Sequence, residues 1–119
     1  MEIPKIFDSE YRFCLILWQN EPVGSTKLVA LCKEQLGWSK ATTYTVIRRL
    51  AERGVLKNEN ATVTSLVSKD DVQQSEIVQF VDKTFEGSIP AFIAAFSRSK
   101  KLTEEEITQL QELIDNYKG

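Results

Sequence analysis

Two helical patterns that follow one another almost without a connection constrain the fold of this chain most. The first pattern covers residues 25–36 and stops at Gly37, and the second begins at Ser39. Glycine readily adopts the left-handed backbone that ends a helix, and a serine hydroxyl accepts a backbone N–H bond at the start of the next helix. Two helices joined by such a short turn predict a helix-turn-helix.

The helix that starts at Ser39, and that we expect to end at Gly54, has an apolar side and a polar side. Its apolar residues recur at helical spacing and are expected to dock on a core; they are Thr43, Val46, Ile47 and Leu50. A helix with hydroxyls and cations on its other side suits the major groove of DNA, although an ordinary amphipathic surface helix has the same spacing.

The polar side of this helix predicts two kinds of contact with DNA. Residues expected to reach base edges, or to lie beside them at the helix start, are Lys40, Ala41, Tyr44, Thr45 and Arg48. Residues expected to hold phosphates, which set position and not sequence, are Ser39, Thr42, Arg53 and Lys57. For Arg49 we favour an internal salt bridge with an acidic residue.

The flanking segments complete a small domain over residues 1–67. We expect a first helix from Asp8 or Ser9 to Asn20, with a core stripe of Tyr11, Cys14, Leu15 and Trp18. In the helix over 25–36, the expected buried side is Leu28, Val29, Cys32 and Leu36. The two tryptophans, Trp18 and Trp38, are interpreted as core residues.

After Gly54 the pattern changes toward a period of two. We predict a strand over 55–57, a turn over 58–60 and a return strand over 61–66. Three helices followed by such a hairpin predict a winged helix, with the hairpin as the wing. Residues 58–65 contain no Lys, Arg or aromatic residue, so we expect this wing to bind a DNA backbone weakly.

Residues 68–119 are predicted to be helical, so the chain is mainly α with one small β-hairpin. Ser68 with Asp71, and Thr103 with Glu106, resemble capping boxes. The apolar stripes of this part have no obvious closed core, and a second copy of the chain would bury them in a two-fold dimer. The expected dimerisation residues are Val78, Val81, Phe85, Phe92, Phe96, Leu110, Leu113 and Ile114.

Charge is distributed unevenly along a chain whose net charge is −2. Residues 1–60 hold nine Lys or Arg and seven Asp or Glu, whereas residues 61–119 hold six and ten. Residues 38–57 hold five cations and one acid, so positive charge concentrates around the candidate recognition helix. Chance clustering on a solvated face would give the same count.

Several function classes are disfavoured by the composition. The chain has no histidine and no glycine-rich phosphate loop, so we expect neither an enzyme nor a metal or cofactor site. Cys14 and Cys32 lie on apolar stripes and are expected to be buried free thiols. The sequence shows no membrane span and no signal-peptide pattern, which predicts a cytoplasmic protein.

Several segments, taken together and in order, resemble the penicillinase-repressor family, the BlaI/MecI/CopY type of bacterial transcription regulators. The first is Ser9-Glu10 with Leu17-Trp18, and the second is Trp38-Ser39 followed by Thr42, Thr45, Arg49-Leu50 and Arg53-Gly54. The others are residues 80–88 and Leu102 to Glu106 ahead of Leu110 and Leu113.

The resemblance implies a winged helix joined to a helical dimerisation arm, and a dimer that represses by binding a palindromic operator. It also implies possible control by a sensor protease, because the penicillinase branch is cut at an Asn-Phe bond that corresponds here to Ala95-Phe96. The asparagine is absent. The cysteine-rich metal-binding tail of the copper branch has no counterpart in residues 115–119. A winged helix that binds only proteins is the alternative.

Overall fold

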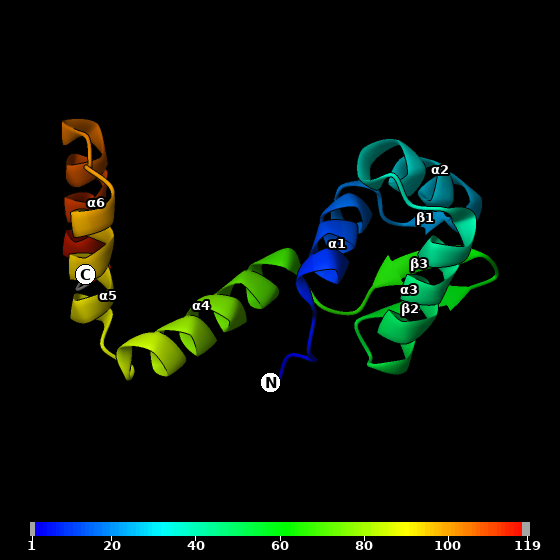
Figure 1. The fold of residues 1–119 in the computed structure, drawn as a ribbon, viewed down its shortest axis with the longest axis horizontal. Coiled ribbons are helices and arrows are strands. Elements are labelled where there is room, and N and C mark those ends of the chain that lie inside the picture. The colour runs from blue at the N-terminus through cyan, green and yellow to red at the C-terminus, as the bar shows by residue number, and fades with distance from the viewer. Residues whose placement is uncertain (1, 118–119) are drawn as a thin grey trace. The chain divides into compact units, whose positions relative to one another are not determined.

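The computed structural model describes residues 2–117 and divides the chain into two compact units, residues 1–76 and 77–119 (Figure 1). The division falls inside helix α4 (Lys69–Phe85), whereas the predicted domain boundary at residue 67 lies just before that helix. The two units are described separately below.

The first unit contains three helices that follow the predicted order. They are α1 (Asp8–Asn20), α2 (Ser25–Leu36) and α3 (Lys40–Glu52) (Figure 1). Gly37 ends α2 with a φ of 70°, and the Ser39 Oγ accepts a 3.1 Å hydrogen bond from the Thr42 amide. The tight turn and the cap of α3 are therefore confirmed.

The start of α1 is capped differently from the prediction. The capping position is Phe7 rather than Asp8 or Ser9. The Phe7 amide donates a 2.9 Å hydrogen bond to Oε1 of Glu10, three residues along. The acceptor is thus a carboxylate inside the first turn, which also lies favourably at the positive end of the helix.

A three-stranded antiparallel sheet accompanies these helices, in the order β1-β3-β2 (Figure 1). The strands are β1 (Val23–Gly24), β2 (Leu56–Glu59) and β3 (Thr62–Ser65). The predicted hairpin is present, but the turn prediction over 58–60 was wrong. Glu59 pairs with Thr62, which leaves only Asn60 and Ala61 in the turn, and both have positive φ. Strand β1 was not predicted.

The core of the first unit is built from α1, α2, α3, the sheet and Val72 at the start of α4. Its largest fully buried side chains are Phe13, Leu17, Leu28, Leu50 and Leu56. In α2 the predicted residues Leu28 and Cys32 are buried, whereas Val29 and Leu36 are half-buried.

The core stripe predicted for α1 was only partly right. Cys14 is buried, but Tyr11, Leu15 and Trp18 are half-buried, and Phe13 and Leu17 occupy the centre. Trp18 donates its indole N–H to the Val67 carbonyl oxygen at 3.0 Å. Trp38 stacks on Phe13, so both tryptophans pack against the core as predicted.

The second unit contains the end of α4, then α5 (Ile89–Ser99) and α6 (Glu104–Tyr117). Thr103 and Glu106 form a reciprocal capping box at the start of α6, with both hydrogen bonds at 3.0 Å. The start of α4, which lies in the first unit, is capped by Ser68, whose hydroxyl accepts a hydrogen bond from the Asp71 amide. Four phenylalanine rings form a chain of neighbouring pairs with centroids 5.7–6.5 Å apart; they are Phe80, Phe85, Phe92 and Phe96.

Most apolar side chains of the second unit are exposed in the single chain. Of the predicted dimerisation residues, the exposed ones are Val78, Phe96, Leu110, Leu113 and Ile114. Phe85 and Phe92 are half-buried, and Val81 is buried, with 2% of its surface exposed. Within residues 2–117, no helix is both long enough and apolar enough to span a bilayer.

Candidate nucleic-acid interface

Helix α3 buries one side and leaves the opposite side open. Its four predicted core residues, Thr43, Val46, Ile47 and Leu50, are all buried, as expected from their spacing. The positions opposite them on a helix are 41, 45, 48 and 52. Ala41, Arg48 and Glu52 are exposed there, and Thr45 is half-buried. This outer line carries a cation in its middle and an acid only at its C-terminal end.

The first turn of α3 is exposed and rigidly held. The Ser39 hydroxyl accepts from the Thr42 amide and also donates to Thr42 Oγ1 at 3.0 Å. Thr43 Oγ1 donates to the Ser39 carbonyl oxygen at 3.2 Å. Ser39, Lys40 and Thr42 are all exposed, so hydroxyls and an ammonium surround the helix start.

Tyr44 lies at the edge of this surface and not at its centre. Its ring is half-buried against the core, and its hydroxyl donates to Ser25 Oγ at 3.3 Å. Ser25 is buried at the start of α2. The predicted base contact by Tyr44 stays a prediction, but the structure already gives the phenol a partner inside the protein.

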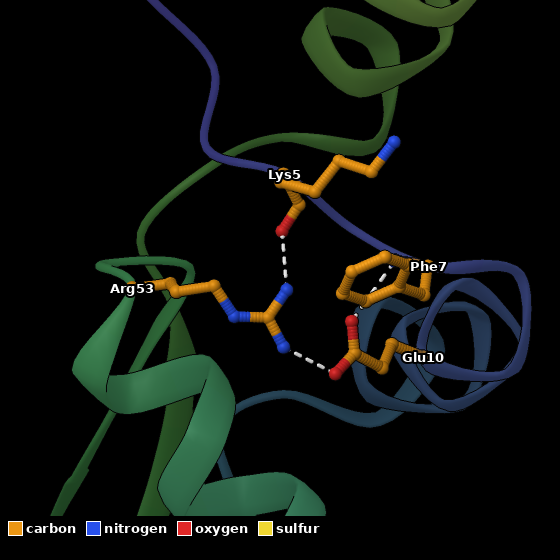
Figure 2. Close-up of polar contacts among 4 residues, drawn as sticks. All are labelled: Lys5, Phe7, Glu10 and Arg53. Atoms are coloured by element: carbon orange, nitrogen blue, oxygen red, sulfur yellow. Dashed lines mark hydrogen bonds and ion pairs between the residues drawn. The ribbon is translucent and has the colours of Figure 1, made fainter.

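Arg53 is half-buried and is held by partners within the protein, in a cluster with the N-terminal segment and the start of α1 (Figure 2). One end of its guanidinium forms an ion pair with Glu10, and Nη1 donates to the Lys5 carbonyl oxygen at 2.7 Å. The Phe7 ring centroid lies 5.3 Å from the guanidinium carbon. We therefore leave Arg53 out of the proposed DNA surface, although sequence analysis assigned it to a phosphate.

An internal salt bridge was predicted for Arg49, but the residue that forms one is Arg53, one helical turn later. Arg49 is exposed and forms no ion pair with any residue between 2 and 117. Arg53 is at the end of the helix, close to the buried side, from where its side chain reaches Glu10 of α1.

Glu10 has an acidic side chain in a largely buried place. Burial raises the pKa of its carboxyl, but hydrogen bonds from Arg53 and Phe7 and the charges of Arg53 and Arg49 outweigh it. The net effect lowers the pKa below its ordinary value of 4.5. The carboxylate is therefore charged at neutral pH. The sequence carries no signal for this pairing, because Glu10 lies 43 residues from Arg53.

The wing offers little positive charge. Lys57, on β2, is exposed, and its Nζ lies 3.9 Å from Oε1 of Glu59 two residues along the same strand. Such an exposed pair is weak and leaves the ammonium able to contact another anion. The exposed cations available beside α3 are therefore Lys40, Arg48, Arg49 and Lys57.

The cysteines do not form a reactive or metal-binding site. Both are buried free thiols, as predicted. Burial raises the pKa of Cys14 to about 12 and that of Cys32 to about 11, so both stay protonated at neutral pH. In the described part of the chain, no group of three or more His, Cys, Asp or Glu side chains is arranged to hold a metal ion.

Comparison with known proteins finds one family and its members, and the matches extend over nearly the whole chain. The family described as "Penicillinase repressor" matches residues 6–116. The penicillinase repressor of Bacillus licheniformis is 21% identical, with 99% of this chain and 95% of the relative aligned. The methicillin resistance regulatory protein MecI of Staphylococcus aureus (strain Mu50) is 24% identical, with 93% and 94% aligned.

Proposed function

The chain belongs to the penicillinase repressor family, and on that premise we propose that it represses transcription as a homodimer bound to a palindromic operator in double-stranded DNA. The observation that carries this proposal is the outer side of α3. Arg48 stands there, exposed, with Ala41 and Thr45 beside it, opposite the buried stripe. Arginine can bind guanine with two hydrogen bonds, and threonine can contact a thymine methyl.

The distribution of charge along α3 favours entry by its N-terminal half. Lys40 lies in the first turn and Arg48 in the middle, whereas the exposed acid Glu52 lies in the last turn. Phosphates repel a carboxylate and attract the cations and the free amides of a helix start. Ser39, Thr42 and Lys57 are placed at the margins of this surface, where contacts with phosphates set the register.

The dimer part of the proposal rests on the exposed apolar side chains of the second unit. Leu113 is 66% exposed and Ile114 is 56% exposed on α6, which also carries the exposed Leu110, and Val78 and Phe96 are exposed elsewhere in the unit. Exposed apolar groups of this number are typical of an interaction site. A two-fold dimer would place two α3 helices on a symmetric DNA site, about one turn of the double helix or a multiple of it apart.

Selection of binding sequences from random duplex DNA tests the proposal, followed by titration of the selected duplex. We expect recovery of an inverted repeat, one dimer per duplex, and a binding constant that falls steeply with added salt. Recovery of no common sequence, together with binding indifferent to salt, would contradict it.

Binding to a protein surface is the second candidate, and the wing favours it. The exposed residues at the hairpin include Glu59, Asn58 and Asn60, and Lys57 already lies near Glu59. A chain that passes through heparin at low salt, and selects no duplex, would support this candidate over the repressor.

Control by a sensor protease at Ala95-Phe96 stays a proposal drawn from the family resemblance. The bond lies inside α5, where the backbone is hydrogen-bonded in a regular helix. A protease that needs an extended substrate could cut it only after this helix unwinds. Cleavage between these residues in cells exposed to the inducing compound, read by mass spectrometry, would support it.

A further inference from the structure

Arg53 marks the corner at which α3 turns toward the wing. It is the C-cap residue of α3, and Gly54, with a φ of 83°, follows it. Val55 and Leu56 come next, and both are buried. A contact that fixes the position of Arg53 therefore also fixes the junction between the end of α3 and the beginning of the hairpin.

The segment before α1 and the first turn of α1 each provide one partner for this side chain. Nη1 of Arg53 donates to the Lys5 carbonyl oxygen, and Nη2 forms the ion pair with Glu10 (Figure 2). The other carboxylate oxygen of Glu10 accepts from the Phe7 amide. A single carboxylate thus connects the start of α1, the segment before it and the end of α3.

The surroundings make this connection costly to break. Glu10 is only 6% exposed and the Arg53 side chain 26% exposed, and the Phe7 ring packs beside the guanidinium. A largely buried charge that loses its partner is strongly unfavourable. Both terminal nitrogens of Arg53 donate to partners within the protein, so a phosphate would have to compete with these partners for the guanidinium.

We infer that Glu10 and Arg53 are positioning residues for DNA recognition: their ion pair sets the direction of α3 and the wing without contacting DNA. The inference rests on the proposed function. The N-terminal segment is not part of the outer side of α3, but through Arg53 it would influence which DNA sequences that side binds. Arginine is required, because a lysine ammonium does not reproduce the flat two-nitrogen fork that reaches both partners.

Conservative variants separate positioning from direct phosphate contact, because the two roles predict opposite results. If Arg53 positions α3, Arg53→Lys and Glu10→Gln each weaken binding to the selected duplex by about tenfold. The double variant is then no weaker than either single variant, and the salt dependence stays that of the native chain. If Arg53 holds a phosphate, Arg53→Lys binds nearly as well as the native protein. Glu10→Gln, which removes a negative charge and frees the guanidinium, then binds more tightly.

Glu34→Gln is the matched control. It removes the same charge from an exposed side chain of α2 that belongs neither to the outer side of α3 nor to the Glu10 and Arg53 pair. We expect its affinity to be unchanged. All titrations are run at a temperature at which circular dichroism shows every variant fully folded, so that reduced stability is not mistaken for reduced affinity.

A measurement without DNA completes the test. In ¹⁵N-correlated spectra of the free protein, Glu10→Gln should shift the amide signals of Thr45 and Arg48, which are remote in sequence from residue 10. Unmoved signals, or tighter binding by Glu10→Gln, overturn the inference. If the native chain binds no duplex at all, the proposed function fails instead, which is a distinct result because it is seen before any variant is made.

Discussion

The Tyr44 hydroxyl donates to Ser25 Oγ at 3.3 Å, and this bond joins the exposed helix α3 to the first residue of α2. The two residues belong to the two helices of the helix-turn-helix, and Ser25 is buried. The bond therefore links the N-terminal half of α3 to the core, while Arg53 does so at the other end.

Loss of this bond should lower stability. Tyr44→Phe leaves the buried Ser25 hydroxyl without its phenolic partner, and we expect the free energy of unfolding in urea to fall by about 1 kcal/mol. Adding Ser25→Ala removes both partners, so the double variant should lose little beyond the Tyr44→Phe variant. Two independent losses that simply add would show that the hydroxyls do not interact.

Arg48 is expected to read a base. Arg48→Ala should weaken operator binding by about 1–3 kcal/mol and relax the preference at one base pair in each half-site. Lys57→Ala is the comparison, because removing an ammonium that binds a phosphate should weaken binding to all sequences alike and flatten the salt dependence. Titration of the operator and of single-base variants separates the two. A uniform loss of affinity for Arg48→Ala would contradict its assignment.

The ion pair of Glu10 should make stability depend on pH. The folded chain lowers the pKa of this carboxyl below 4.5, so the charged form stabilises the fold above that pH. The contribution is lost as the pH falls through the lowered folded-state value. Glu10→Gln should therefore be less stable than the native chain by about 1–3 kcal/mol at pH 7. This gap should shrink in urea titrations at progressively acidic pH, and a constant gap down to pH 3 would exclude the ion pair as its source.

Leu113 should lie in the dimer interface. Leu113→Glu places a charge among exposed apolar residues of α6, and sedimentation should show a monomer at concentrations where the native chain is dimeric. Operator affinity should fall with it, because each monomer meets only one half-site. Thr108→Glu adds the same charge to an exposed polar position on the other side of α6 and should remain dimeric. If Leu113→Glu also remains dimeric, the interface lies elsewhere.

The wing turn should tolerate glycine better than its native residue. Ala61 has a φ of 60°, a conformation that disfavours a side chain, and Asn-Gly is the preferred pair in such a two-residue turn. Ala61→Gly should raise the free energy of unfolding by up to about 1 kcal/mol, measured in urea. Ala30→Gly, in the exposed part of helix α2, should lower it by about 1 kcal/mol. A loss of stability in both variants would argue against strain at Ala61.

Much of the helical framework could be predicted because its signals are local. Gly37, Ser39 and Gly54 act within one turn of the helix ends they form, and the spacing of Thr43 to Leu50 is a property of a single helix. The reciprocal cap of Thr103 and Glu106 spans three residues. Such features depend on neighbours in the chain, so they can be read before the chain is folded.

The partners of individual side chains could not be read in this way. Strand β1 exists because Val23 pairs with Val63, and Arg53 is held within the protein because Glu10 lies beside it. The burial of Val81, Phe13 and Leu17, and the half-burial of Tyr44, follow in the same way from packing between elements. The spacing of apolar residues and the capping residues specified where the helices begin and which side of each helix is apolar. Contact between residues some 40 positions apart decided which cations are paired within the protein and which remain exposed, because an ion pair depends on distance in space and not on separation along the chain.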